Sequence, residues 1–348
     1  MKFKNLKVYG LAILAGVTVF IAAKAGMPKE ASANIDLPAK TIETPVNSEG
    51  TPINDVPSLV NEEGVPLEAF DAVQVQPTQI VEETKEPDHY PYEIFPAVES
   101  TTDLNVRFDP STDSMILGTV TPGFKFEKIE DVGDWDKVEY YGQFGYVHDD
   151  YTTDTYMVKG TPTRVIYSQY EVNFKDKEQG TTKTLNPYEV MFVFGEEPDR
   201  LLVYADGRLG YVENREYATL TGTYTVVDKS DQRIDLYRDN ELLYSSPVVT
   251  GKDTTPTSTG FFPVWYEKHD DYLSGPDFDP VAINDFYAFN GGQGLHDAYW
   301  RYTFGDSSYH TNGSHGCVNL PMATGDIISD FFEEAQDKGE TPSVLVKQ

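Results

Sequence analysis

The sequence predicts a mainly β protein: two small β-barrels followed by a mostly antiparallel β domain that carries one or two helices. Three observations lead to this fold class. From about residue 104, short runs of apolar and β-branched residues alternate with turn residues, as in small barrels. A weaker copy of the first group of strands follows it at a near-constant offset. Helical spacing of apolar residues is clear only near the C-terminus.

Composition narrows the classes of protein that this chain can represent. Its 348 residues suggest two or three domains, and 39% hydrophobic residues suffice for folded cores. The chain has 57 acidic and 27 basic residues, with a formal net charge of −30. We therefore expect no nucleic-acid partner, because neutralising phosphates requires clustered Lys and Arg.

Residues 1–33 predict an export signal. Lys2, Lys4 and Lys7 precede an apolar run from residue 8 to residue 23. This run is shorter than the roughly 20 residues of a membrane-spanning helix. Residues 31–33, Ala-Ser-Ala, form a small-x-small cleavage site. We favour a cleaved signal peptide, with a retained membrane anchor as the alternative, and either one places the rest of the chain outside the cytoplasm.

Residues 34–98 predict a disordered linker. They contain thirteen acids, two lysines and nine prolines, and their apolar residues follow neither helical nor strand periodicity. Proline and like-charge repulsion keep such a segment extended. Its expected role is to give reach from a membrane or a cell wall.

Residues 99–155 predict the first barrel. Five short strands are expected within about 50 residues; they lie at residues 104–107, 116–120, 124–126, 135–138 and 145–147. The opening Asn-Val-Arg strand at residues 105–107 and the closing Gly-Tyr-Val at residues 145–147 resemble the bacterial Src-homology-3-like domain.

Residues 160–220 predict a second, divergent copy of that domain. Residues 172–175 lie 68 positions after residues 104–107, and residues 206–212 lie 65 positions after residues 141–147. The near-constant offset indicates a tandem repeat. Family resemblance implies that these domains bind the cell wall, but they can equally be spacers, because a fold does not by itself confer a function.

Residues 222–348 predict the last domain. Alternating residues predict strands at 224–228, 233–237 and 242–244, with a hairpin turn at Asp239 and Asn240. A closing strand is expected at 344–346. The helix is predicted from apolar residues at helical spacing, which are Ile327, Ile328, Phe331, Phe332 and Ala335.

Cys317 is the only cysteine, so the chain cannot form an internal disulfide. Just before it, Gly313 and Gly316 bracket Ser314 and His315, which suits an exposed turn better than a packed core. A thiol with the ordinary pKa of about 8.5 is only slightly ionised at pH 7 and needs a base. His315 lies two positions away, and His296 follows the glycine-rich residues 290–294, where the chain can bend back toward the thiol.

These residues resemble the signature of an L,D-transpeptidase catalytic domain. His296 is followed by seventeen residues and then by Ser-His-Gly-Cys-Val-Asn at residues 314–319. Upstream, Thr-Gly-Lys at residues 250–252 and Thr-Pro at 255–256, followed by Gly-Phe at 260–261, resemble a second motif of the family, with a departure in loop length.

The resemblance implies acyl transfer on peptidoglycan. Cys317 would attack the third residue of a tetrapeptide stem, releasing the terminal D-alanine, and an amine of a neighbouring stem would resolve the thioester into a 3→3 cross-link. No metal or organic cofactor is required, and carbapenem β-lactams are the expected inhibitors. The cell wall and its stem peptides are the expected partners.

Roles are assigned accordingly. The resemblance makes Cys317 the nucleophile and His296 the proton acceptor and donor, with the Asp297 backbone orienting the histidine. The amides of Gly316 and Cys317 are the expected oxyanion donors, and His315 and Ser314 are supporting groups near the thiol. Trp300 and Asn319 are assigned as substrate-binding residues. His315 can instead be structural, Trp300 can pack in the core, and the Asn319 amide is expected to bond to backbone groups.

Three other functions remain open. Water in place of the acceptor amine would make the enzyme an L,D-carboxypeptidase. A non-catalytic wall-binding protein is also possible, although Cys317 and His296 are both present. A zinc site would need His296, His315 and Cys317 as ligands, but the chain has no His-Glu-x-x-His or paired-cysteine motif.

Overall fold

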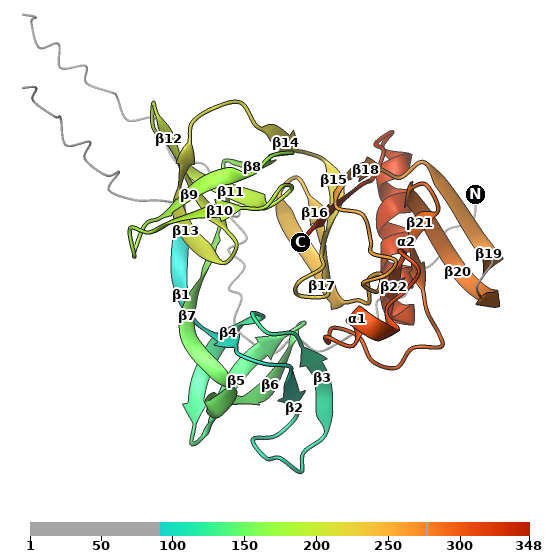
Figure 1. Ribbon diagram of the computed structural model, residues 1–348, viewed down its shortest axis with the longest axis horizontal. Helices are drawn as coiled ribbons and strands as arrows, with labels where there is room; N and C mark the ends of the chain where they lie inside the picture. The colour runs from blue at the N-terminus through green and yellow to red at the C-terminus, as the bar shows by residue number, and fades with distance from the viewer. Residues whose placement is uncertain (1–90, 276–277) are drawn as a thin grey trace, which may run out of the picture. The chain divides into compact units, whose positions relative to one another are not determined.

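The computed structural model describes residues 91–275 and 278–348 (Figure 1). The expected signal at residues 1–33 and most of the expected linker lie outside these residues. Among the described residues, no helix is both long and apolar enough to cross a membrane. The fold is mainly β, as predicted.

The first domain is a seven-stranded sheet with the order β3-β2-β6-β5-β4-β1-β7. Its strands are β1 (Tyr92–Ser100), β2 (Leu104–Arg107), β3 (Ile116–Val120), β4 (Lys125–Val132), β5 (Trp135–Tyr140), β6 (Gln143–His148) and β7 (Thr152–Gly160), with the 3-10 helix η1 (Asp149–Tyr151) before β7. Val106, Phe126, Val138 and Val147 are buried in its core. Because these residues alternate with more exposed neighbours, one face of each strand packs inward.

Strand β1 differs from the sequence-based expectation, which assigned residues 92–98 to the linker. All nine residues of β1 pair with β7, from Tyr92 opposite Gly160 to Ser100 opposite Thr152. The first half of the strand is largely exposed and contains Pro96, so it has no clean alternation. Its pairing partner lies about sixty residues away in sequence, and no local pattern could reveal it.

The second domain repeats the strand order of the first, with each strand replaced by the one seven places later: β10-β9-β13-β12-β11-β8-β14. Its strands are β8 (Arg164–Tyr167), β9 (Val172–Asp176), β10 (Thr182–Leu185), β11 (Val190–Glu196), β12 (Arg200–Ala205), β13 (Arg208–Glu213) and β14 (Ala218–Leu220). The shared order agrees with the internal repeat inferred from the sequence.

The third domain contains two sheets and two helices. The five-stranded sheet has the order β17-β16-β15-β23-β18, and the four-stranded sheet has the order β19-β20-β21-β22. The elements are β15 (Thr223–Asp228), β16 (Arg233–Arg238), β17 (Glu241–Pro247), β18 (Gly260–Pro263), β19 (Tyr266–Gly275), β20 (Phe278–Asn290), β21 (Gln293–Asp297), α1 (Tyr309–Asn312), β22 (Val318–Leu320), α2 (Met322–Asp337) and β23 (Ser343–Lys347).

Helix α2 covers one face of the four-stranded sheet (Figure 1). Ile328 and Phe332, one helical turn apart, are fully buried in a cluster with Leu295 of β21 and Val318 of β22. Side chains of a strand alternate between its two faces, so the neighbours of Leu295 and Val318 point away from α2. That opposite face carries His296 and Asn319.

Candidate active site

Pairing within the four-stranded sheet brings the candidate residues onto one face. His296 on β21 lies opposite Phe286 of β20 on one side and opposite Asn319 of β22 on the other. Cys317 directly precedes β22, two positions before Asn319, and packs, as Trp300 does, against the buried cluster that contains Phe286. The sheet therefore gathers a thiol, an imidazole and an amide from two parallel strands.

The turn before Cys317 depends on Gly316. Its φ is +114°, a conformation that residues with a Cβ rarely adopt. A Cβ there would also lie 2.7 Å from Nε2 of Gln293. The His315 side chain is exposed, and its expected place beside Cys317 stays a prediction.

Ser314 holds the turn through its hydroxyl. Ser314 Oγ accepts the Gly316 N–H at 3.0 Å and donates to the Cys317 carbonyl at 2.6 Å. The sequence predicted the Gly316 amide as an oxyanion donor, but in this structure that amide is already engaged by Ser314. Gly316 also allows the turn, and an oxyanion role for its amide stays a prediction.

Two residues that the sequence did not single out also hold this turn. Thr257 Oγ1 accepts the Gly251 N–H at 2.9 Å and donates to the Gly316 carbonyl at 3.0 Å. Gln293 accepts the Ser258 N–H at 3.0 Å through its side-chain oxygen and donates to the Pro256 carbonyl at 3.1 Å. Both contacts anchor the region of the Thr-Pro motif near the thiol, and the motif was the signal that could have indicated them.

The Cys317 thiol lies among backbone groups of the glycine-rich loop. Its side chain is partly exposed, and Sγ lies 3.7 Å from the Gly292 carbonyl. Burial raises the pKa of Cys317, while a hydrogen bond from the Gly294 backbone lowers it, with a net rise. Burial therefore favours the neutral thiol over the thiolate.

His296 is 4% exposed and both of its ring nitrogens have protein partners. Nδ1 lies 2.8 Å from the Asp297 carbonyl, the contact that the family resemblance implies. Nε2 lies 2.9 Å from Nδ2 of Asn319. Burial lowers the pKa of His296 and Arg301 adds to this, while the Asp297 carbonyl and carboxylate oppose it, with a net fall.

Asn319 and Asp297 are both almost completely buried. Asn319 was expected to bond to backbone groups or substrate; instead its amide lies between His296 and Arg301, whose Nε is 2.8 Å from Oδ1. The Asp297 side chain also has a structural contact, since Oδ1 accepts backbone N–H groups of Asn284 and Asp285 at 2.8 and 3.0 Å.

Trp300 flanks the site. Its ring lies 5.9 Å from the His296 ring and 5.1 Å from that of Tyr299, and it packs with Cys317 against Phe286. This placement is compatible with both roles considered from the sequence, because the partly exposed indole can pack beside the thiol and still face a substrate.

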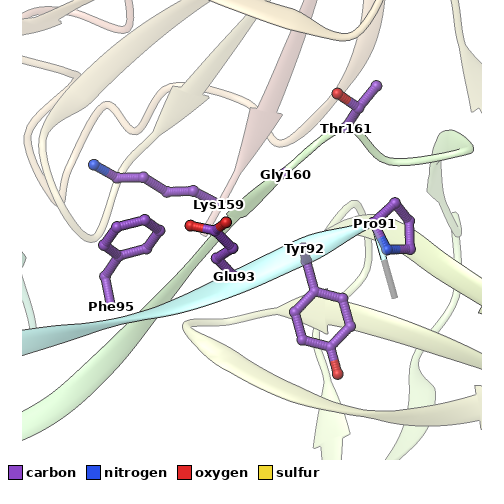
Figure 2. A pocket seen from close by; sticks show the side chains of 7 residues that line it. All are labelled: Pro91, Tyr92, Glu93, Phe95, Lys159, Gly160 and Thr161. Atoms are coloured by element: carbon purple, nitrogen blue, oxygen red, sulfur yellow. The ribbon is translucent and has the colours of Figure 1, made fainter. Parts of the chain in front are cut away.

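Two hollows lie away from the candidate active site. Figure 2 shows a hollow of about 490 Å³ on the β1–β7 ribbon, where Lys159 lies over the Phe95 ring. A hollow of about 300 Å³ in the first barrel is lined by Arg107, Trp135 and other residues. Neither is lined by Cys317 or His296.

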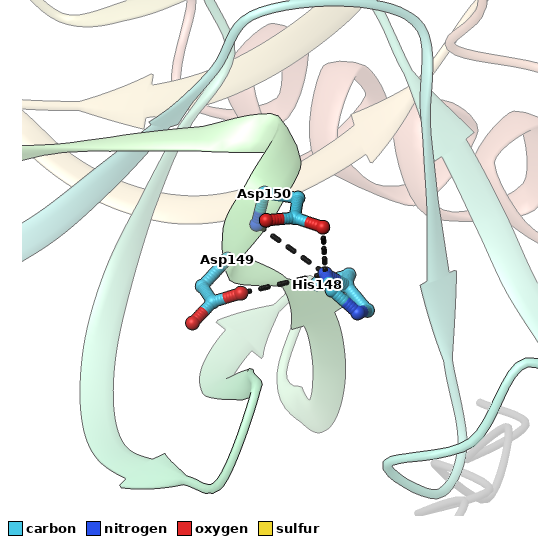
Figure 3. A group of neighbouring side chains, drawn as sticks. All are labelled: His148, Asp149 and Asp150. Carbon is cyan, nitrogen blue, oxygen red and sulfur yellow. Dashed lines mark hydrogen bonds and ion pairs between the residues drawn. The ribbon is translucent and has the colours of Figure 1, made fainter.

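A cluster of possible metal ligands lies on the first barrel (Figure 3). Its members, His148, Asp149 and Asp150, have ligand atoms within 4.8 Å of one another. The Asp150 N–H and both carboxylates already contact His148 Nδ1. The zinc ligands considered from the sequence do not converge in this way, since His296 uses both nitrogens on protein groups.

Comparison with known proteins identifies two domains. The L,D-transpeptidase catalytic domain family, YkuD, matches residues 222–336, and the bacterial SH3 domain family matches residues 102–153. No curated protein matches the chain.

Three solved structures illustrate the similarity. The catalytic domain of an L,D-transpeptidase from E. faecium, acylated by ertapenem, is 32% identical, covers 37% of this chain and 98% of its own, and has a TM-score of 0.32. A mutant of the Enterococcus faecium L,D-transpeptidase is 25% identical over 52% and 75% of the two chains, with a TM-score of 0.32. L,D-transpeptidase 3 from Mycobacterium tuberculosis is 14% identical over 46% and 92%, with a TM-score of 0.29. On the family matches, the chain belongs to the L,D-transpeptidases, with a YkuD catalytic domain preceded by a bacterial SH3 domain.

Proposed function

We propose that this chain forms 3→3 cross-links in peptidoglycan through a thioester on Cys317. The observation that carries the proposal is the placement of Cys317 and His296 on one sheet face, inside the region that matches the L,D-transpeptidase family. The thiol is partly exposed, the imidazole is buried, and both lie near Phe286. This arrangement suits an accessible nucleophile with a positioned base.

The first half-reaction consumes the donor stem. Because Nδ1 donates to the Asp297 carbonyl, the lone pair lies on Nε2, which takes the thiol proton once the Asn319 amide that faces it moves aside. The Cys317 sulfur attacks the carbonyl carbon of the third, diamino residue of a tetrapeptide stem. When the tetrahedral intermediate collapses, the C–N bond to the terminal D-alanine breaks, and the leaving amine takes the proton from His296. The product is a thioester and free D-alanine.

The second half-reaction forms the cross-link. A side-chain amine of a neighbouring stem attacks the thioester carbonyl, loses a proton to His296, and displaces the Cys317 sulfur, which is reprotonated. Each well-placed oxyanion donor contributes about 2.7–4 kcal/mol to such steps. Because Ser314 already occupies the Gly316 N–H, the Cys317 N–H is the remaining donor among those proposed from the sequence.

The proposal places the protein outside the cytoplasm. Peptidoglycan lies there, and the basic, apolar and small-residue pattern of residues 1–33 is typical of an export signal. The two barrels would then hold the catalytic domain at the cell wall, and the enzyme would contribute to wall assembly and cell shape.

Carbapenem inhibition is part of the same proposal. The related E. faecium catalytic domain carries an ertapenem acyl group. In this chain, attack of Cys317 on the β-lactam carbonyl would open the ring and leave an acyl-enzyme. Intact-protein mass spectrometry should show one added carbapenem, and a Cys317→Ala variant should show none.

The decisive experiment uses tetrapeptide muropeptides and the chain without residues 1–33. A cross-linked dimer that lacks one D-alanine, formed by the native protein and absent with Cys317→Ala, would support the proposal. Release of D-alanine with tripeptide as the only product would establish the L,D-carboxypeptidase alternative instead. Equal cross-linking by Cys317→Ala would overturn the mechanism.

A further inference from the structure

A chain of three hydrogen bonds passes through the imidazole of His296, the candidate base. Arg301 Nε lies 2.8 Å from Oδ1 of Asn319, and Asn319 Nδ2 lies 2.9 Å from Nε2 of His296. The opposite ring nitrogen, Nδ1, lies 2.8 Å from the Asp297 carbonyl. Arg301 comes from the segment after β21, while Asn319 belongs to β22. Distant segments therefore converge on one imidazole.

The donors and acceptors in this chain leave one consistent arrangement. A guanidinium group only donates, so it must face the Asn319 oxygen. The Asn319 NH₂ then faces His296 and can only donate, so Nε2 must accept and carries no proton. The Asp297 carbonyl can only accept, so Nδ1 must carry the proton. The ring is a neutral imidazole with its lone pair on Nε2.

If the oxygen and nitrogen of the Asn319 amide exchanged places, the hydrogen bonds to Arg301 and to His296 would both be disrupted. Its NH₂ would then face the Arg301 N–H, donor against donor, and its oxygen would require a proton on Nε2 while Nδ1 also holds one. That second requirement is a charged imidazolium, which burial at 4% exposure disfavours. Arg301 is thus the group that removes the amide's rotational ambiguity.

We propose that Arg301, acting through Asn319, is a positioning residue that fixes His296 as the neutral tautomer with an unprotonated Nε2. This form can take the proton of Cys317 once the Asn319 amide releases Nε2, and only that clause rests on the function proposed above. Nothing in the sequence motif indicates Arg301, which lies five residues after His296 and does not belong to residues 314–319.

Charged groups around the imidazole agree with this role. Arg301 is partly buried, and no carboxylate lies within ion-pair distance of it in the described part of the chain. Its charge lowers the pKa of His296, and the Asp297 carboxylate raises it. Asp306 acts on Arg301 rather than on the ring. The remaining titratable group packed nearby is the Cys317 thiol, and the β20 side is the apolar Phe286 ring.

The test is nitrogen NMR of the protein labelled with ¹⁵N-histidine, with the His296 signals assigned by a His296→Gln variant. In the unmodified protein, the Nε2 shift should be that of an unprotonated nitrogen at pH 7, and Nδ1 should be protonated. A proton on Nε2 at pH 7 would overturn the proposal, and this measurement needs no folded variant of the network.

Two substitutions extend the test. Asn319→Asp leaves only acceptors facing Nε2, so the pKa of His296 should rise by about 1–3 units, with both nitrogens protonated at neutral pH. Arg301→Met frees the amide to turn its oxygen toward Nε2 and removes a charge that lowers the pKa of His296, so the Nε2 signal should shift toward that of a protonated nitrogen; Arg301→Lys, which restores a donor and the charge, should recover the native signals. Arg215→Met, an exposed arginine in the second barrel, is the matched control.

These outcomes separate the inference from the proposed function. An unchanged tautomer in both Asn319→Asp and Arg301→Met would overturn the role of Arg301. The expected tautomer in a protein that makes no cross-link would leave the inference standing and refute the proposed function.

Discussion

Replacing Thr257 with valine should loosen the turn that carries Cys317. Thr257 is 1% exposed, and its hydroxyl joins the Gly251 N–H to the Gly316 carbonyl. It therefore connects the Thr-Gly-Lys segment to the turn before Cys317 through one oxygen atom. Valine has nearly the same volume, so the substitution removes both hydrogen bonds without opening a large cavity.

The loss of stability follows from the two buried backbone groups that lose their partner, the Gly251 N–H and the Gly316 carbonyl. An unpartnered buried donor or acceptor costs about 1–3 kcal/mol. With partial relaxation, Thr257→Val should lower the free energy of unfolding by about 2–4 kcal/mol. At about 4 °C of Tm per kcal/mol for a domain of this size, the Tm should fall by about 10 °C. Displacement of the turn should also slow acylation of Cys317 by about 10- to 100-fold.

Calorimetry and carbapenem acylation followed by mass spectrometry would measure the two effects. Thr257→Ser keeps the hydroxyl and should preserve most of the acylation rate. Thr254→Val changes an exposed threonine nearby and should alter neither quantity. If Thr257→Val unfolds within 1–2 °C of the native protein, about what a neutral surface change gives, and acylates equally fast, the hydroxyl does not hold the turn.

Three further results are expected. Because burial raises the pKa of Cys317, its alkylation by iodoacetamide should be slower at pH 7 than that of free cysteine and rise with a midpoint above the ordinary thiol value; a midpoint below it would contradict the structure. Lys347→Met removes the cation that lies 2.7 Å from Asp228 and 3.1 Å from Glu189, which should cost about 3–5 kcal/mol in urea unfolding; an unchanged midpoint would show that the ion pairs contribute nothing. Burial raises the pKa of Asp231 from 3.8 to about 7, with Asp228 adding to the rise. Folding therefore takes up a proton between these values, and stability should fall as pH rises through that window. Asp231→Asn should remove about 2–4 kcal/mol of this dependence, seen as a smaller difference between the Tm values at pH 5 and pH 8; an unaltered difference would place the titration elsewhere.

Local patterns in the sequence determined most of the secondary structure. The strands expected at residues 104–107 and 116–120 match β2 and β3 at both ends, and the strand expected at 344–346 lies within β23. The turn at Asp239 and Asn240 has positive φ values of 50° and 69°, which suits the hairpin that was predicted there. In each case alternation or turn chemistry acts over a few residues and is visible without knowledge of the partner.

Strands held by distant partners were harder to predict. Residues 92–98 belong to β1 because β7 pairs with them along their whole length, whereas their acidic, proline-containing composition resembles the preceding linker. The long hairpin of β19 and β20 was also not anticipated, since many of its β19 residues are exposed and lack a regular apolar face.

At the site, the sequence alone determined which residues are the candidates for the chemistry, because a lone cysteine, a histidine and their spacing are properties of the chain. Only the tertiary structure decided how they are held. It engaged the Gly316 amide with Ser314, placed Thr257 beneath the turn, and set Asn319 between His296 and Arg301. These hydrogen bonds depend on which backbone and side-chain groups come together when separate segments pack. No periodic pattern in the sequence indicates such contacts.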